Sequence, residues 1–138
     1  MRYLDRLQPL ALLALRVVIG VIMVGHGYQK VFGGFSHVQD LVHRIGFPEF
    51  FAYLLAATEF GGGILMMLGL LTRFVAVAML IDMSVAIWKV HWPNGLIGRA
   101  GYEFPLCMAV IAFSLIFFGG GPLSLDHLLT SGAPKPKK

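Results

Sequence analysis

Four stretches of almost unbroken apolar sequence dominate the chain, separated by polar, glycine-rich and proline-containing segments. They cover about residues 9–27, 50–71, 74–90 and 104–118. A helix needs about 20 apolar residues to cross the hydrocarbon core of a bilayer, so the last two stretches are short for a span. Because backbone groups in lipid must be bonded within their own segment, all four stretches are expected to be helices. The pattern therefore predicts an all-α fold, a transmembrane four-helix bundle.

The connecting segments predict how the chain enters and leaves the membrane. The long segment 28–49 is expected to hold a short interfacial helix at about 36–42. With four spans both termini share a side, which would carry Arg2, Arg6, Arg73, Lys135, Lys137 and Lys138. The other side would carry Lys30, Arg44, Lys89 and Arg99. Because lysine and arginine favour the cytoplasmic side, we predict cytoplasmic termini. One transmembrane domain is expected over residues 1–130, followed by a disordered basic tail at 131–138.

Composition and charge narrow the class of protein. Apolar residues make up 57% of the chain and charged residues only 13%, whereas soluble domains average about 25% charged. The net charge of +4 comes from basic residues scattered over the termini and loops. Because they form no basic face, nucleic-acid binding is not expected. The single cysteine, Cys107, excludes an intramolecular disulfide and dithiol chemistry by this chain alone.

Three charged residues, Arg16, Glu59 and Asp82, fall inside the apolar stretches. A charge at the centre of a span costs roughly 2.5–3.5 kcal/mol on insertion scales, and such residues usually face the bundle interior. Counted from the outer ends of the predicted spans, all three lie roughly 12–15 Å deep at about 1.5 Å per residue. We therefore expect them to form one layer.

Each of these residues shares a helix face with small neighbours. Arg16 is expected to form a stripe with Gly20, Met23, Gly27 and Lys30, and Glu59 one with Ala52, Ala56, Gly62, Gly63 and Met66. Asp82 shares its face with Val75, Ala78, Ala86 and Lys89. Small residues allow membrane helices to approach closely, so these faces are predicted to be the packed ones.

The charged layer admits two interpretations. In one, Arg16 is a structural strut that pairs with one or both acids. In the other, the layer is the floor of a polar pocket, beneath a second layer of His26, Lys30, His91, Asn94 and Glu103. One arginine and two acids leave a surplus negative charge, which leads to the hypothesis that Glu59 or Asp82 holds a proton. The histidines and acids lack the close spacing of a metal motif, so no metal site is expected.

Several short motifs point to a known family. They are Leu15-Arg16 with Gly20, His26-Gly27-x-x-Lys30 with Gly33-Gly34, Glu59-x-Gly61-Gly62, Leu68-Gly69-Leu70-Leu71-Thr72-Arg73, Asn94-Gly95, Gly101-Tyr102-Glu103 and Gly119-Gly120-Gly121-Pro122-Leu123-Ser124-Leu125-Asp126. In this order and spacing, over about residues 12–126, the chain resembles the DoxX family of small four-helix membrane proteins.

The resemblance implies a bacterial inner-membrane protein linked to redox chemistry. Relatives in that family include quinone-reducing membrane subunits of thiosulfate oxidation and members of thiol-redox and oxidative-stress complexes. It implies a small subunit that binds a quinone or similar lipophilic ligand, with His26, Arg16 or Glu59 contacting carbonyl oxygens. No haem or flavin motif is present, so no intrinsic cofactor is expected and electrons would come from a partner protein. With Cys107 as its only cysteine, this chain differs from those family members that would use a pair of cysteines.

Two other functions remain open at this point. A scaffold or assembly subunit would bind a partner's transmembrane helix over Gly61, Gly62 and Gly63. A small proton-linked transporter would need a homo-oligomer, because four spans per chain are few.

Overall fold

The computed structural model describes residues 2–131, and all the regular secondary structure within this range is helical. The elements are α1 (Arg2–Asp5), α2 (Gln8–Phe32), α3 (Phe35–Arg44), α4 (Phe50–Ala56), η1 (Ala57–Gly61), α5 (Gly62–Leu68), α6 (Thr72–Val85), η2 (Ala86–His91), η3 (Trp92–Asn94), α7 (Glu103–Phe118) and α8 (Leu125–Ser131). The predicted all-α class is confirmed. Ser131, the first residue of the predicted tail, ends α8, and residues 132–138 lie outside the described range.

Three helices are long and apolar enough to cross a membrane: Gln8–Phe32, Phe50–Leu68 and Thr72–Asn94. The fourth apolar helix, α7, has 16 residues and is shorter. The first span was predicted to end at residue 27, but α2 continues for five more residues to Phe32. The polar residues beyond Gly27 do not break the helix, because Lys30 points inward and meets a carboxylate on the neighbouring span.

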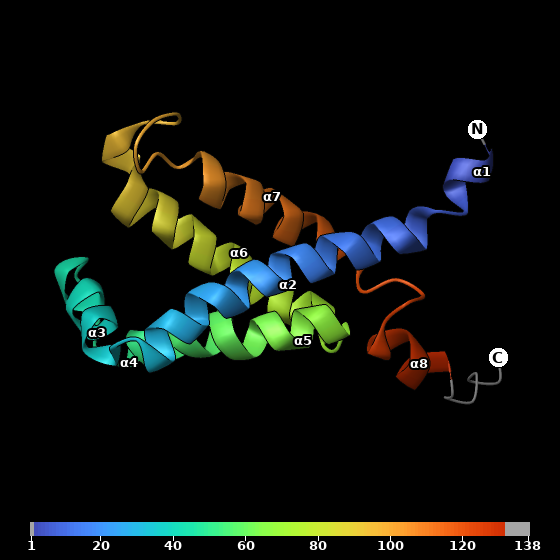
Figure 1. Cartoon of the computed structure of the whole chain (residues 1–138), viewed down its shortest axis with the longest axis horizontal. Coiled ribbons are helices and arrows are strands. Elements are labelled where there is room, and N and C mark those ends of the chain that lie inside the picture. The colour runs from blue at the N-terminus through green and yellow to red at the C-terminus, as the bar shows by residue number, and fades with distance from the viewer. Residues whose placement is uncertain (1, 132–138) are drawn as a thin grey trace, which may run out of the picture.

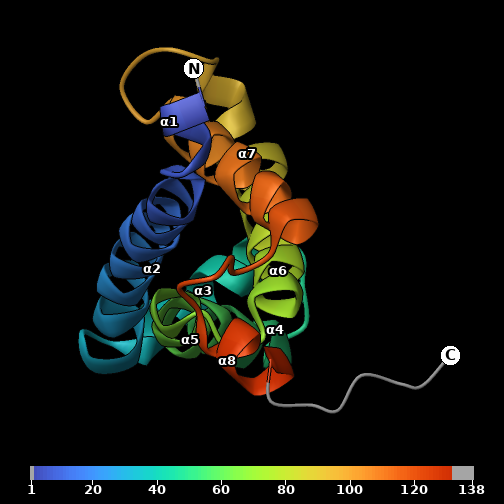
Figure 2. The same cartoon turned by 90° about the vertical axis from the view of Figure 1, so that its right-hand side faces the viewer.

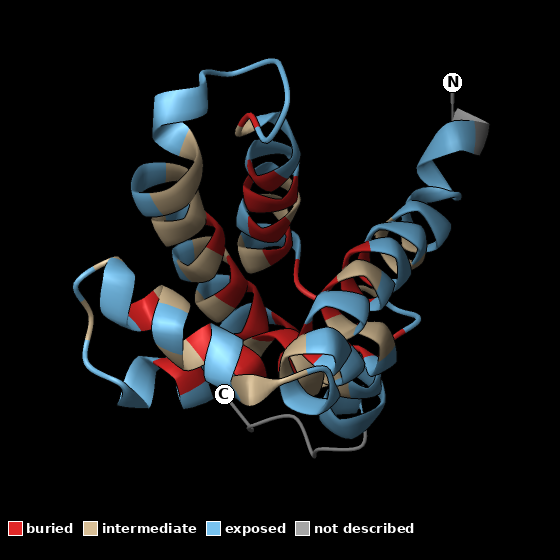
Figure 3. Cartoon of the chain, turned by 60° about the vertical axis from the view of Figure 1, so that its left-hand side comes forward, coloured by how far each residue is buried: buried red, intermediate tan, exposed pale blue. Residues whose placement is uncertain are grey.

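The four long helices form two pairs, with α1 and α8 at the same end of the molecule (Figure 1). In the first helix pair, α2 packs on the Phe50–Leu68 helix, and in the second, α6 packs on α7. The pairs meet near the middle and diverge toward the end that carries α3 and the α6–α7 connection (Figure 1). Buried residues concentrate where the pairs meet, as Figure 3 shows. This divergence leaves room for a cavity between the pairs.

Glycines bring the two helices of the first pair into close contact. A Cβ placed on Gly20 would lie 2.8 Å from the carbonyl oxygen of Gly63, and one on Gly27 would lie 2.4 Å from the backbone nitrogen of Phe60. Gly62 and Gly63 are buried, so two of the three glycines in the run Gly61–Gly63 are used inside the bundle. The scaffold interpretation, which placed a partner's helix over this run, therefore loses most of its surface.

Methionines fill much of the core at the junction of the pairs. Met23, Met66, Met79 and Met108 are all 2% exposed or less. Flexible thioether side chains suit a junction of helices that cross at different angles. A second, smaller cluster joins Val38 to α4, so the short helix expected at 36–42 exists as α3 and packs on the first pair.

Arg16 does not lie in a layer with Glu59 and Asp82, and this part of the sequence prediction is wrong. Its side chain is fully buried, and its Nη2 donates to the carbonyl oxygen of Leu123, after the fourth helix. The depth was counted from His26, whereas α2 ends at Phe32. Arg16 is 16 residues before that end, about 24 Å along the helix at about 1.5 Å per residue. Glu59 is only nine residues from the start of its own span.

Instead, Arg16 belongs to a junction at the end of the molecule near the termini, which we call the terminal junction: Arg16, Gly69, Leu71, Thr72, Leu123 and Asp126. The guanidinium lies against Gly69, where an added Cβ would fall 1.6 Å from Nη1. Asp126 accepts hydrogen bonds from the N–H groups of Leu71 at 2.7 Å and Thr72 at 2.8 Å. Its own N–H donates to the carbonyl oxygen of Gly69 at 2.9 Å. Asp126 thereby caps α6 and ties α8 to the turn between the second and third spans (Figure 2).

The charge state of Asp126 follows from this environment. Burial raises the pKa of Asp126, but the backbone N–H groups of Thr72 and Leu71, the Thr72 side chain and the charge of Arg16 hold it below its ordinary value. The carboxylate is therefore the form that the folded terminal junction favours.

Replacing Gly63 by alanine should destabilise the fold, whereas the same change at Gly61 should not. The new Cβ at Gly63 would lie 2.8 Å from a Val24 methyl and 2.9 Å from the carbonyl oxygen of Gly20, while nothing lies within 4 Å at Gly61. We expect Gly63→Ala to cost about 1–3 kcal/mol through overpacking. Gly61→Ala should be neutral or stabilising by up to about 1 kcal/mol, since alanine favours helix. Thermal unfolding in detergent, followed by circular dichroism, compares the two, and equal shifts would contradict the glycine contact.

Replacing Asp126 by asparagine should lower stability at neutral pH by about 0.5–2 kcal/mol, because one of two capping bonds and the charge next to Arg16 are lost. Since the pKa of Asp126 is lowered on folding, its contribution is fully present above the unfolded pKa near 4 and disappears as pH falls through the lower folded value. The stability difference between the original protein and Asp126→Asn should therefore shrink in acid. Asp40→Asn, at an exposed acid of α3, is the control. A difference that is constant with pH would contradict the assignment.

Candidate functional site: a polar cavity between the helix pairs

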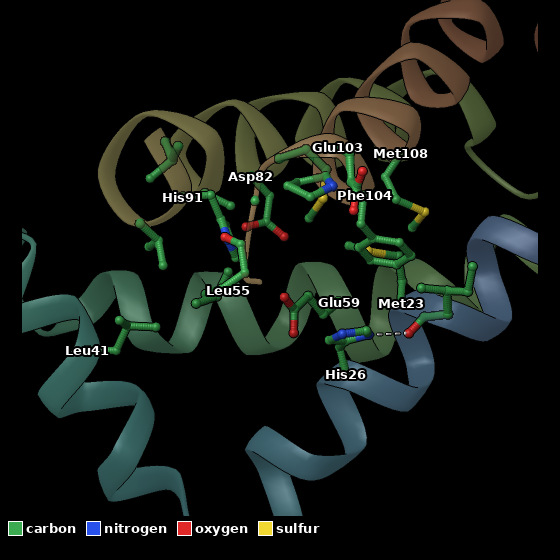
Figure 4. Close-up of a pocket in the computed structure, with 18 of the residues that line it drawn as sticks. Met23, His26, Leu41, Leu55, Glu59, Asp82, His91, Glu103, Phe104 and Met108 are labelled. Atoms are coloured by element: carbon green, nitrogen blue, oxygen red, sulfur yellow. Dashed lines mark hydrogen bonds between the residues drawn. The ribbon is translucent and has the colours of Figure 1, made fainter. Parts of the chain in front are cut away.

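A cavity of about 420 Å³ lies between the two helix pairs. It is on the diverging side of the molecule, away from the terminal junction. Apolar side chains make most of its wall, among them Met23, Leu41, Leu55, Phe104 and Met108 (Figure 4). Six ionisable side chains also line it: His26, Lys30, Glu59, Asp82, His91 and Glu103. The structure thus brings six of the eight predicted site residues together, and leaves out Arg16 and Asn94.

Glu59 is the most buried acid of the cavity, with 3% of its surface exposed. Its Oε1 forms an ion pair with the ammonium of Lys30 on α2. Its Oε2 is buried and has no hydrogen-bond partner among residues 2–131. A buried carboxylate oxygen without a partner is costly, so this atom is available to a ligand. The close contact of Gly27 with Phe60 sets the spacing of the two helices that makes the pair possible.

Asp82 faces Glu59 across the cavity from the second helix pair (Figure 4). Its Oδ2 is buried and also lacks a partner within the described part of the chain. Two acids from different helix pairs therefore present unpartnered oxygens to one cavity. The shared site for Glu59 and Asp82 agrees with the sequence prediction, although the cation beside them is Lys30 and not Arg16.

Two histidines complete the polar part of the wall. The Nδ1 of His26 lies 2.9 Å from the carbonyl oxygen of Ile22, and the Nδ1 of His91 lies 2.8 Å from that of Ala100. Because a carbonyl oxygen only accepts, Nδ1 carries the proton in both rings, and Nε2 of the neutral ring is an acceptor. The His26 ring also stacks on Phe104, with centroids 6.0 Å apart. His26 and Phe104 are both exposed, so this pair lies at the mouth of the cavity between α2 and α7.

Asn94 does not line the cavity, contrary to the prediction. Its side-chain Nδ2 donates to the carbonyl oxygen of Ala100 at 3.0 Å, the same oxygen that His91 binds. Ala100 has a φ of 65°, a left-handed conformation that a residue with a side chain seldom adopts. Asn94 and His91 thus hold the strained loop that closes one side of the cavity. Glu103 begins α7, lines the cavity and is exposed.

Two π-helical segments lie at the cavity, and nothing in the sequence pattern predicted them. Glu59 sits in η1, and His91 ends η2. A π-helical turn holds one more residue than an α-turn, so it rotates the side chains that follow, and such turns are frequent at functional sites. Their presence beside the cavity therefore supports its assignment as the candidate site.

The motifs noted in the sequence separate into two places. Arg16, the segment 68–73 and the segment 119–126 meet in the terminal junction. The motifs containing His26, Lys30, Glu59 and Glu103 meet at the cavity. Within the described residues, no group of three or more His, Cys, Asp or Glu side chains is arranged to hold a metal ion. Cys107 is exposed on α7 and does not line the cavity.

Comparison with known proteins agrees with this architecture. The model of the DoxX family matches residues 11–92. CatD of Bacillus subtilis, provisionally named as an oxidoreductase, is 35% identical over 87% of this chain and 87% of its own. An uncharacterized membrane protein of Mycobacterium tuberculosis is 32% identical over 96% of this chain and 89% of its own.

The inner membrane protein YqjF of Escherichia coli is 28% identical over 91% of this chain and 97% of its own. No solved structure matches the chain. With its membrane-spanning helices and a family match over more than half its length, this chain belongs to the DoxX family.

Proposed function

We propose that the protein is a small inner-membrane subunit of a redox system, and that its cavity binds a quinone or a similar lipophilic ligand. The observation that carries this proposal is the pairing of apolar walls with two unpartnered carboxyl oxygens, on Glu59 and Asp82, inside a membrane-spanning bundle. Ligand pockets are typically about 300–1,000 Å³, mostly apolar, with a few polar groups that fix orientation. The cavity of about 420 Å³ fits that description.

The lining suits a ligand with a polar head and an apolar tail. Lys30, Glu59 and Asp82 form a polar part of the lining, where the Lys30 ammonium can donate to a carbonyl oxygen of a quinone ring. Met23, Met108 and Phe104 provide the apolar surface against which the ring would pack (Figure 4). The exposed pair of His26 and Phe104 at the mouth leaves a route for an isoprenoid tail toward the lipid.

The chain's own residues would bind and orient the ligand, and the quinone would supply the electron-accepting chemistry. With one cysteine, Cys107, the chain has no dithiol to donate electrons. We therefore propose that a partner protein in the membrane or at its surface delivers them. The name of CatD as an oxidoreductase supports a redox role, and that of YqjF supports an inner-membrane location. The excess of lysine and arginine on the side of the termini supports placing both termini in the cytoplasm.

Replacing Glu59 by glutamine should weaken quinone binding with little loss of stability. Glutamine can still accept a hydrogen bond from Lys30 but lacks the charge that holds the ammonium in place, so the donor for a quinone oxygen is less well positioned. We therefore expect at least about a tenfold rise in Kd, or about 1.4 kcal/mol. Binding of decylubiquinone to the detergent-solubilised protein is measured by quenching of Trp88 and Trp92, the chain's two tryptophans, which follow Asp82 in the Thr72–Asn94 helix.

The matched control is Glu49→Gln, at an exposed acid that accepts a hydrogen bond from Gln39 and does not line the cavity. It should bind decylubiquinone like the original protein. Thermal unfolding of both variants separates binding from folding. Equal losses of binding and stability in Glu59→Gln would show that the Lys30–Glu59 pair is a strut, and an absence of saturable binding by the original protein would overturn the quinone proposal.

A further inference from the structure

The hydrogen-bonding groups of the cavity are unequally divided between donors and acceptors. Ionised Glu59, Asp82 and Glu103 can only accept. His26 and His91 each use the Nδ1 proton on a backbone carbonyl oxygen, so their neutral rings offer only an accepting Nε2. Among the described residues, Lys30 is the sole lysine or arginine of the lining, and it is paired with Glu59. The cavity is therefore rich in acceptors and poor in free donors.

A quinone, the ligand class of the proposed function on which this inference rests, has carbonyl oxygens that only accept. A cavity whose acids were all ionised would confront these oxygens mainly with other acceptors. The mismatch is removed if one acid carries a proton, because a carboxylic acid offers an O–H donor. The acids therefore need to be compared for which one holds it.

The contacts of the three acids distinguish them. Glu59 has a cation bonded to it, which favours its ionised form. Glu103 is exposed in the first turn of α7, where water and the partial positive charge of a helix N-terminus favour a carboxylate. Among the described residues, no cation is bonded to Asp82 and no group is hydrogen-bonded to its buried Oδ2. A carboxyl oxygen buried without a partner favours the neutral form of its group over the charged form.

We propose that Asp82 carries a proton in the ligand-free protein and that its carboxyl O–H donates a hydrogen bond to a carbonyl oxygen of the bound ligand. Glu59 remains ionised beside Lys30 and holds that ammonium in place. The titratable groups that line the cavity with Asp82 are His26 and Lys30 from α2 and Glu59 from η1, in the first helix pair, and His91 from η2 and Glu103 from α7, on its own side. No proton transfer is required by this arrangement, and Asp82 acts as a binding group.

Infrared spectroscopy of the ligand-free protein tests the first half of the proposal. At neutral pH the C=O stretching band of a protonated carboxylic acid should be present in the original protein. It should be absent from Asp82→Asn. A band that survives in Asp82→Asn and disappears in Glu59→Gln would assign the proton to Glu59, and no band in any of them would mean that all the acids are ionised. Either result overturns the proposal.

The pH dependence of decylubiquinone binding tests the second half. Affinity in the original protein should fall as pH rises and Asp82 ionises, since the donor is lost and a negative charge is left. Asp82→Asn keeps a donor that does not titrate, so it should retain affinity within about threefold and show a flat profile. Asp82→Leu, which has no donor, should bind at least tenfold more weakly than Asp82→Asn. Circular dichroism confirms that each variant is folded.

If the affinity of Asp82→Asn for decylubiquinone still depended on pH, the hydrogen-bond donor would be a protonated His26 or His91, and the proposal would be wrong. Equal affinity of Asp82→Asn and Asp82→Leu would do the same. If the original protein binds no quinone, the function proposed above fails, whereas the infrared measurement still decides whether Asp82 holds the proton. The two failures are therefore distinguishable.

Discussion

The close contact between α2 and the Phe50–Leu68 helix is the constraint on which the site depends. Gly20 and Gly27 allow the two backbones to approach to distances at which a Cβ would clash, and this spacing brings Lys30 to Glu59. In lipid, helix association gains little from the hydrophobic effect and relies on close packing and polar contacts. The same contact therefore supplies both: packing along the glycine faces, and an ion pair where the helices begin to diverge.

The charged residues that the fold buries or half-buries are divided between two places with different roles. At the terminal junction, Arg16 and Asp126 are held by backbone groups of the Gly69–Thr72 turn and of Leu123, and they join the end of the chain to the bundle. At the cavity, Glu59 and Asp82 each keep an oxygen without a partner. Nε and Nη1 of Arg16 and Oγ1 of Thr72 at the terminal junction also lack a partner among the described residues, so an unpaired atom alone does not mark a ligand site. At the cavity the unpaired oxygens lie beside a mostly apolar space of about 420 Å³, and this combination indicates a site for a ligand. The structural strut and the polar pocket, which were two interpretations of one charged layer in the sequence, are therefore two separate places in the fold.

Much of the site was predictable because helical periodicity depends only on residue spacing. The buried stripe of Arg16, Gly20, Met23 and Gly27 and the placing of Glu59 on a small-residue face follow from that period. The depth of Arg16 did not follow from the helical period, because it depends on where α2 ends. That end lies five residues beyond the predicted apolar stretch. The position of Asn94 was also misjudged, because its amide is taken up by the Ala100 carbonyl in a loop of unusual conformation.

By itself the sequence determined the class, the number of apolar helices, the faces that pack and the family motifs. These properties follow from composition and local spacing along the chain. Only the tertiary structure decided that Lys30 and not Arg16 is the partner of Glu59, that Asp82 lies across the cavity, and that π-helical segments hold Glu59 and end at His91. Those outcomes depend on where helices end and how far two helix pairs diverge. Both are set by contacts between residues far apart in the chain, which no local pattern records.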